Sequence, residues 1–224
     1  MGILYLVRHG QASFGAADYD RLSELGTRQC TRLGQWWRSR GVQFDAVLTG
    51  TLKRQVQSLA AIESGLGATC GEALQWPGLN EYDSHAVVRA LHGELPPAPT
   101  TPEQRRQYFA LLRQGLAAWM AGRTQPEGMP AHAEFLRGVV GALDHVRTHH
   151  ARQRVLIVSS GGPIAHALGH VLGLADNAVI DLNMQIRNSA VCELKVSARR
   201  MGLVTFNELP HLHEAEHQSW MTWA

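Results

Sequence analysis

The sequence predicts an α/β protein with a largely parallel sheet. Residues 3–7 and 154–158 form two mostly apolar runs, and each leads into a polar, glycine-containing turn. Runs of this length suit strands, and their continuous apolar character is typical of strands covered on both faces. Helical patterns alternate with the strands, which favours a parallel sheet with helices on both sides. We therefore expect a three-layer α/β/α, doubly wound sheet, with an antiparallel edge at its end.

The remaining elements follow from apolar spacing and from turn residues. Ser23 is expected to cap a helix that ends near Gly41, and the segment 49–51 to cap the helix after the second strand. Strands are predicted at 44–48, 188–196 and 203–209, an extended segment at 74–79, and helices at 52–64, 84–92, 103–121, 131–150 and 164–172. Four prolines between residues 95 and 102 interrupt this order. We expect one domain over 1–224, with 83–130 as an inserted helical lid.

Composition limits the classes of function. Of 224 residues, 45% are hydrophobic and 18% charged, and the net charge is +2. This balance is typical of an ordinary globular protein and gives no indication of a nucleic-acid or membrane partner. No apolar run approaches the length of a membrane span. Three widely spaced cysteines indicate neither disulfides nor a zinc site, so we expect a cytoplasmic protein.

Three strand-to-helix turns carry polar chemistry. Arg8 and His9 follow the first strand, and Gly10 is expected to permit a tight turn there. Arg54 falls in the first turn of a helix, where backbone N–H groups and the helix dipole favour an anion. Ser160 and Gly161 lie at the third turn, just before a helix. Because strand ends of one sheet converge, these residues predict a single site for a doubly charged anion such as phosphate.

Other residues allow plainer interpretations. His145 and His149, like His166 and His170, have the spacing of metal ligands on a helix, but no third ligand is evident, so we interpret both pairs as structural. A serine nucleophile at position 160 would need glycine at position 158, where valine stands. Trp36, Trp37 and Trp119 are expected to pack in the core or the lid. Trp220 and Trp223 lie in a terminal tail that could contact a second subunit, which makes a homodimer one expectation.

Five segments in the same order resemble the histidine phosphatase superfamily, also called the phosphoglycerate mutase-like family. The first is Leu6-Val7-Arg8-His9-Gly10, which is similar to the signature of that family. The others are residues 52–58, 79–81, 155–164 and 188–191. The similarity covers most of the chain except the predicted lid.

The resemblance implies a phosphomonoester hydrolase that acts through a phosphohistidine. His9 would attack phosphorus, Arg8 and Arg54 would hold the phosphoryl oxygens, and Glu81 would protonate the leaving oxygen. From the residues alone, Glu81 reads as an ordinary loop carboxylate. Gly10, Ser13, Ser160 and Gly161 would complete the binding site for a small phosphate ester. Neither a metal nor another cofactor is implied, because the guanidinium groups supply the positive charge.

The chain departs from the family at position 160, where Ser160 replaces the second histidine. A serine hydroxyl can donate a hydrogen bond to phosphate, but it cannot supply the charge of an imidazolium. Ala12 also stands where relatives often have a hydroxyl, a place that Ser13 could take. The expectation is therefore a phosphatase of reduced activity, which Ser160→His should raise. The alternatives are a protein that binds a phosphorylated ligand without turnover and, less favoured, a phosphoglycerate mutase.

Overall fold

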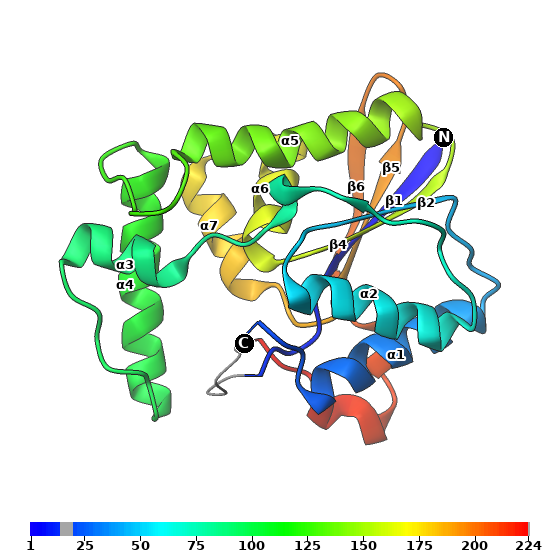
Figure 1. The fold of residues 1–224 in the computed structure, drawn as a ribbon, viewed down its shortest axis with the longest axis horizontal. Helices are drawn as coiled ribbons and strands as arrows, with labels where there is room; N and C mark the ends of the chain where they lie inside the picture. The colour runs from blue at the N-terminus through cyan, green and yellow to red at the C-terminus, as the bar shows by residue number, and fades with distance from the viewer. Residues whose placement is uncertain (14–19, 224) are drawn as a thin grey trace.

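The computed structural model describes residues 1–13 and 20–223, and residues 14–19 of the predicted loop after Gly10 lie outside the described part. The core is a six-stranded sheet with the order β3-β2-β4-β1-β5-β6 (Figure 1). The strands are β1 Gly2–Arg8, β2 Ala46–Thr49, β3 Leu74–Gln75, β4 Arg154–Ser159, β5 Val191–Val196 and β6 Met201–Glu208. The strands β3, β2, β4 and β1 are parallel, whereas β5 is antiparallel to β1 and β6 is antiparallel to β5. The predicted fold class, including its antiparallel edge, is confirmed.

The helices follow the predicted order with one addition. They are α1 Glu24–Arg38, α2 Lys53–Leu66, α3 Ser84–His92, α4 Pro102–Met120, α5 His132–His149, α6 Gly161–Leu172 and α7 Asp176–Gln185. Short 3₁₀ turns span Pro77–Leu79, Pro210–Leu212 and Ala215–Trp220. The sequence did not predict α7, because its buried apolar residues Val179 and Ile180 are adjacent and give no helical repeat. Helix α6 begins three residues earlier than expected.

The two faces of the sheet are covered by different helices. Leu4 and Leu6 of β1 pack in the core cluster that contains α5 and α6, whereas Val7 packs in the cluster formed with α1 and α2. In β4, Val155 and Ile157 likewise face the first cluster, and Leu156 and Val158 the second. Successive side chains of a strand point to opposite faces, so a strand between two helical layers is apolar at every position. This explains the unbroken apolar runs of the two central strands.

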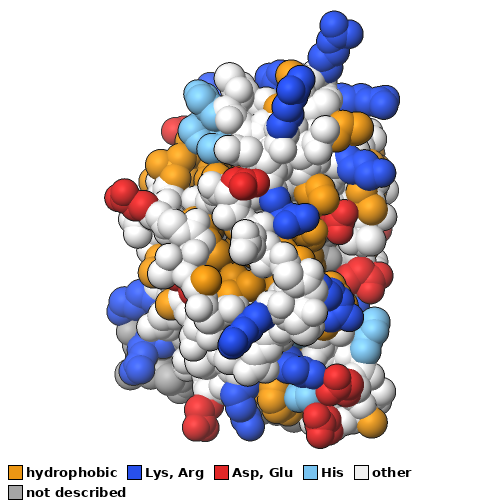
Figure 2. All heavy atoms as spheres, turned by 90° about the vertical axis from the view of Figure 1, so that its right-hand side faces the viewer, with side chains coloured by type: hydrophobic (Ala, Val, Ile, Leu, Met, Phe, Trp, Pro, Cys, Tyr) orange, Lys and Arg blue, Asp and Glu red, His pale blue; other side chains and the backbone are white. Residues whose placement is uncertain are grey.

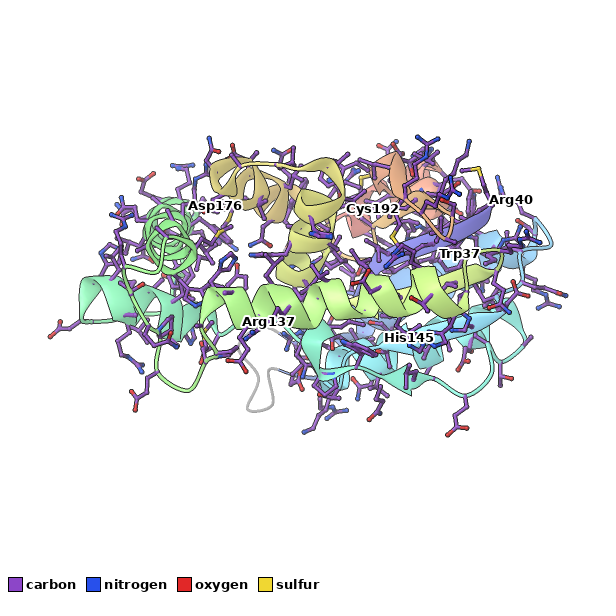
Figure 3. The ribbon with its side chains drawn as sticks, turned by 90° about the horizontal axis from the view of Figure 1, so that it is seen from above. Trp37, Arg40, Arg137, His145, Asp176 and Cys192 are labelled. Carbon is purple, nitrogen blue, oxygen red and sulfur yellow. The ribbon has the colours of Figure 1, made fainter. Side chains whose placement is uncertain are left out.

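Helices α3 and α4 lie beside the sheet, at the left of Figure 1. Thr101 caps α4 by accepting a hydrogen bond from the backbone N–H of Gln104. The inner face of α4, including Leu116 and Trp119, continues the core cluster of α5 and α6. In the view from above, α4 lies near Asp176, where α7 begins (Figure 3), and an ion pair joins Arg113 of α4 to Asp181 of α7. The segment that the sequence marked as a lid is therefore helical, as expected.

The surface carries charges of both signs. On the face shown in Figure 2, basic and acidic side chains are interspersed with apolar ones. Among the described residues, no helix has the length and apolar character needed to cross a bilayer.

Candidate active site

The first and third of the polar turns, which follow β1 and β4, lie together because these two strands are neighbours in register. Arg8 pairs with Ser159 across β1 and β4, and the N–H of His9 donates to the carbonyl oxygen of Ser159 at 2.8 Å. His9 and Ser160 therefore follow neighbouring strands at the same edge of the sheet. A Cβ on Gly10 would lie 2.3 Å from the carbonyl oxygen of Gly26. Glycine is required here for close backbone approach to α1, rather than for the tight turn that the sequence suggested.

His9 is buried and held in one tautomer. Its Nδ1 lies 2.7 Å from the carbonyl oxygen of Gly10, which can only accept, so Nδ1 carries the proton. The Nε2 atom then has a free electron pair, and Arg54 Nε donates to it at 3.2 Å. Burial lowers the pKa of His9 well below its ordinary value, and the charges of Arg8 and Arg54 lower it further. A neutral imidazole with an unprotonated Nε2 is the form that can act as a nucleophile.

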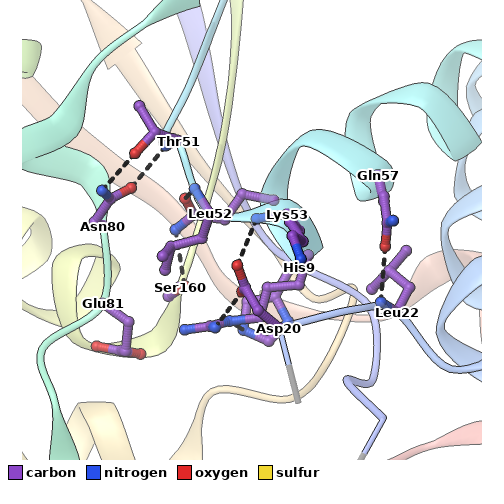
Figure 4. Close-up of polar contacts among 12 residues, drawn as sticks. His9, Asp20, Leu22, Thr51, Leu52, Lys53, Gln57, Asn80, Glu81 and Ser160 are labelled. Atoms are coloured by element: carbon purple, nitrogen blue, oxygen red, sulfur yellow. Dashed lines mark hydrogen bonds and ion pairs between the residues drawn. The ribbon is translucent and has the colours of Figure 1, made fainter. Parts of the chain in front are cut away.

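Arg54 lies in the first turn of α2, as predicted, but the side chains of residues 49–51 do not cap that helix. The residue before α2 is Leu52, which makes no side-chain cap, and the N–H of Thr51 donates to Asn80 Oδ1 at 2.7 Å. The carboxylate of Asp20 accepts from the N–H of Lys53 at 2.8 Å and from Arg54 Nη1 at 2.6 Å (Figure 4). The anion site expected at this helix N-terminus therefore holds the carboxylate of Asp20. The predicted capping by residues 49–51 was wrong.

Arg8 extends from the end of β1 toward the C-terminal segment. Its Nη1 donates to the carbonyl oxygens of Ile186 and Trp223. Asn188 supports the same region, because its side chain donates to the carbonyl oxygen of His9 at 3.3 Å and accepts from Thr222 Oγ1 at 2.9 Å. The guanidinium of Arg8 is therefore held at the sheet edge by segments distant in sequence.

Glu81 lies against the N-terminus of α6. The N–H of Gly162 donates to both carboxyl oxygens, at 3.1 and 3.2 Å. A Cβ at position 162 would lie 2.2 Å from Glu81 Oε1, so glycine is needed for this approach. Burial raises the pKa of Glu81, while the hydrogen bond from Gly162 and the charges of Arg54 and Arg8 oppose the rise. A carboxyl group with a raised pKa is suited to donate a proton.

Ser160 is fully buried at the start of α6. Its Oγ accepts a hydrogen bond from Nε2 of Gln55 at 2.8 Å, and the same amide donates to the carbonyl oxygen of Leu79 at 2.8 Å. A Cβ on Gly161 would lie 3.8 Å from Arg8 Nε, so this glycine borders the guanidinium. Ser160 and Gly161 are thus both placed at the edge where His9 lies.

The structure brings together most of the residues that the sequence selected. Arg8 and Arg54 each influence the pKa of both His9 and Glu81, so the four side chains share one electrostatic environment. Ser13 differs, because its N–H donates to the carbonyl oxygen of Arg21 and no hydrogen bond within the described part of the chain joins its hydroxyl to the other four.

Two contributors were missed by sequence reasoning. Asp20 precedes α1 without a motif of its own, and Gln55 sits one residue after Arg54 in a helical pattern that predicts only core packing. Their partners, Arg54 for Asp20 and Ser160 for Gln55, become visible only in three dimensions.

Three of the four histidines interpreted as structural, His145, His149 and His166, have local partners. His145 and His149 stack with ring centroids 4.5 Å apart. His166 is buried and bonds to the carbonyl oxygen of Gly162 and, at 3.1 Å, to Nε2 of His132. Trp37 and Trp119 are buried, as expected.

Comparison with known proteins gives a family and a fold. Residues 4–209 match the histidine phosphatase superfamily (branch 1). A 2,3-bisphosphoglycerate-dependent phosphoglycerate mutase from Methylorubrum populi is 33% identical over 87 residues, which cover 36% of this chain and 41% of the relative. The match thus spans less than half the length of that relative.

Two solved structures illustrate the similarity in fold. A mutant phosphoserine phosphatase from Entamoeba histolytica, in complex with phosphoserine, has a TM-score of 0.66 at 17% identity, covering 95% of this chain and 100% of that one. A phosphoglycerate mutase from Bacillus anthracis has a TM-score of 0.62 at 15% identity, covering 93% and 94%. At this identity the structural likeness shows the fold alone. Because the matched family region extends over nearly the whole chain, this protein belongs to the histidine phosphatase superfamily (branch 1).

Proposed function

We propose that this chain is a metal-independent phosphomonoester hydrolase that forms a phosphohistidine on His9 and acts on a small phosphate ester. The observation that carries the proposal is the state of His9. Its Nδ1 proton is committed to the carbonyl oxygen of Gly10, and its Nε2 electron pair lies beside the guanidinium of Arg54. A buried, neutral imidazole among cationic groups favours attack on a phosphoryl group, whose negative charge those groups would stabilise.

The reaction has two steps. In the first, the Nε2 electron pair of His9 forms a bond to phosphorus, the bond from phosphorus to the ester oxygen breaks, and Glu81 gives that oxygen its proton. In the second, the oxygen of a water molecule bonds to phosphorus, the phosphorus–nitrogen bond breaks, and its electron pair returns to Nε2. The carboxylate of Glu81 accepts the proton of the water, which restores the starting state.

Arg8 and Arg54 would balance the charge of the phosphoryl oxygens through both steps. A guanidinium offers several donors in a planar fork that matches these oxygens. The proposal therefore requires neither a metal ion nor another cofactor. Ser160 and the glycines that follow it would close the remaining side of the phosphoryl group.

The test is hydrolysis of p-nitrophenyl phosphate and of a panel of small phosphate esters by the wild type and by His9→Ala. We expect release of phosphate by the wild type, a covalent phosphate on its intact mass, and loss of both in His9→Ala. His149→Ala, which removes an exposed imidazole distant from the site, is the matched control and should behave like the wild type. Equal rates for wild type and His9→Ala would overturn the proposal.

A binding function is the second candidate, and Ser160 favours it. A neutral hydroxyl replaces a charged donor there, and loss of one oriented donor can cost about 10²- to 10³-fold in rate. A binding protein would take up inorganic phosphate or a phosphate ester with no release of product. The absence of phosphate release and of a covalent phosphate in the wild type separates it from an enzyme.

A mutase activity is supported by the name of the relative from Methylorubrum populi. Two arginines of α4 weigh against it, because Arg106 pairs with Glu103 and Arg113 pairs with Asp181. Paired guanidiniums are less available for a second phosphate group. With 3-phosphoglycerate as substrate, a hydrolase releases phosphate, whereas a mutase forms the 2-phospho isomer without net release.

A further inference from the structure

Gln55 is fully buried beside the candidate site, and its orientation is fixed by its partners. One end of its amide faces the carbonyl oxygen of Leu79 at 2.8 Å, and the other faces the N–H of Leu52 at 3.3 Å. A carbonyl oxygen only accepts and an N–H only donates, so the NH₂ group must lie toward Leu79 and the oxygen toward Leu52. The second hydrogen of the NH₂ group points to Ser160 Oγ at 2.8 Å.

Ser160 therefore accepts from Gln55, and its own hydroxyl hydrogen has to point elsewhere. Ser160 immediately precedes α6, yet its side chain does not cap that helix. Among the described residues, its hydroxyl donates to no acceptor. Ser160 follows the strand that pairs with β1, one residue beyond the contact of Ser159 with His9. In the view of Figure 4 it lies between Glu81 and His9.

We propose that Gln55 is a positioning residue that makes Ser160 a hydrogen-bond donor to the phosphoryl group. Its amide occupies the acceptor side of Ser160 Oγ, so the hydroxyl hydrogen is left for an anion at the sheet edge. A hydroxyl that already accepts a hydrogen bond is also polarised into a better donor. Gln55 and Ser160 together thus supply the neutral donor that stands at the place of an imidazole. This inference rests on the proposed function.

A purely structural role for Gln55 is the competing explanation, because its amide also holds the carbonyl oxygen of Leu79. That carbonyl has a second donor, however, since Ser159 Oγ lies 2.7 Å from it. Leu79 therefore keeps a partner when Gln55 is replaced, and the segment that leads to Glu81 stays anchored. The two explanations differ in whether the effect of Gln55 depends on the hydroxyl of Ser160.

A double-mutant cycle tests that dependence. Gln55→Met, Ser160→Ala and the double variant are compared with the wild type by kcat/KM for p-nitrophenyl phosphate and by the inhibition constant of inorganic phosphate. We expect Gln55→Met to lower kcat/KM about tenfold in the presence of Ser160 and less than about twofold in the Ser160→Ala background. A loss of the same size in both backgrounds would overturn the inference.

The matched control is Gln57→Met on the same helix, whose side chain accepts from the N–H of Leu22 and does not bond to Ser160. It should leave kcat/KM within about twofold of the wild type. If Gln55→Met fails to fold, the smaller Gln55→Leu takes its place in the cycle. A wild type that binds phosphate without hydrolysis moves the cycle to phosphate affinity, with the same expected pattern. A wild type that neither hydrolyses an ester nor binds phosphate would overturn the proposed function, and this inference with it.

Discussion

Arg54 Nε lies 3.2 Å from His9 Nε2 and donates a hydrogen bond to the electron pair that would attack phosphorus. The guanidinium of Arg54 therefore covers the nucleophilic atom of His9. A phosphoryl group offers stronger, charged acceptors, so its arrival is expected to draw the guanidinium onto its oxygens and release the electron pair. Arg54 would then shield the electron pair of His9 before the substrate binds and hold the phosphoryl oxygens afterwards.

The pH profile of the reaction should be set by His9 and Glu81. The pKa of His9 is lowered well below 6.5, so His9 stays unprotonated through neutral pH and loses reactivity only in clearly acidic solution. The pKa of Glu81 is raised above 4.5, so the protonated form needed for the first step persists to higher pH than for an ordinary glutamate. We expect kcat/KM to fall on the acidic side only well below pH 6.5, as His9 takes up a proton, and on the alkaline side as Glu81 ionises.

The variant Glu81→Gln separates the acidic and alkaline limbs of this pH profile. It should remove the alkaline limb and lower the rate more for an alkyl phosphate, whose leaving oxygen needs a proton, than for p-nitrophenyl phosphate, which has a good leaving group. An alkaline limb that persists unchanged in Glu81→Gln would assign it to another group.

Asp20 should compete with the incoming anion. Its carboxylate bonds to the N–H of Lys53 and to Arg54, at the helix N-terminus where a phosphate would be favoured. Asp20→Asn keeps an acceptor for Lys53 but removes the negative charge. We expect the inhibition constant of inorganic phosphate to fall about fivefold, since a charged hydrogen bond to Arg54 no longer has to be exchanged.

Glu214→Gln is the control for Asp20→Asn, because it removes a carboxylate from an arginine pair with Arg32 at another place on the chain. It should leave phosphate inhibition unchanged. Weaker inhibition in Asp20→Asn would instead show that Asp20 serves mainly to orient Arg54.

The sequence predicts the fold and the strand-end chemistry because both have local signals. The apolar runs that end at Arg8 and at Ser159 locate the central strands, and the strand ends place His9 and Ser160 at one edge. The contact of Trp223 with Arg8 has no such signal, since it joins residues 215 positions apart. The reason for glycine at position 162 is similarly hidden, because it depends on how closely Glu81 approaches.

Stability should fall in mildly acidic solution, and His166 should contribute a measurable part of that fall. Burial lowers the pKa of this histidine to about 4, against 6.5 for an unperturbed one, so the unfolded chain takes up its proton first as the pH falls. The free energy of unfolding is therefore not reduced by His166 above pH 6.5, and it decreases as the pH falls from 6.5 toward 4. Between pH 7 and pH 5 we expect this residue to reduce the free energy of unfolding by about 2 kcal/mol.

The variant His166→Asn should flatten this dependence, because it retains a donor for the carbonyl oxygen of Gly162 but does not titrate. His170→Asn, on the exposed side of the same helix, is the control and should keep the wild-type slope. Urea unfolding at several pH values measures the difference, and equal slopes for His166→Asn and the wild type would contradict the assignment.

Introducing an imidazole at position 160 should require space that Gln55 occupies. The sequence alone predicts that Ser160→His raises turnover. In the structure Ser160 is fully buried and its Oγ lies 2.8 Å from the Gln55 amide, so a larger side chain meets Gln55. We expect Ser160→His by itself to lower the melting temperature and to leave kcat/KM at or below the wild-type value. With Gln55→Ala added, the ring gains room, and kcat/KM should rise at least about tenfold over Ser160→His, because a charged donor then faces the phosphoryl group.

The variant Gln55→Ala without the histidine controls for the loss of the amide, and its kcat/KM should not rise in this way. A rise in kcat/KM from Ser160→His by itself would mean that the side chain of Gln55 moves aside without loss of stability. The space at position 160 would then not limit activity.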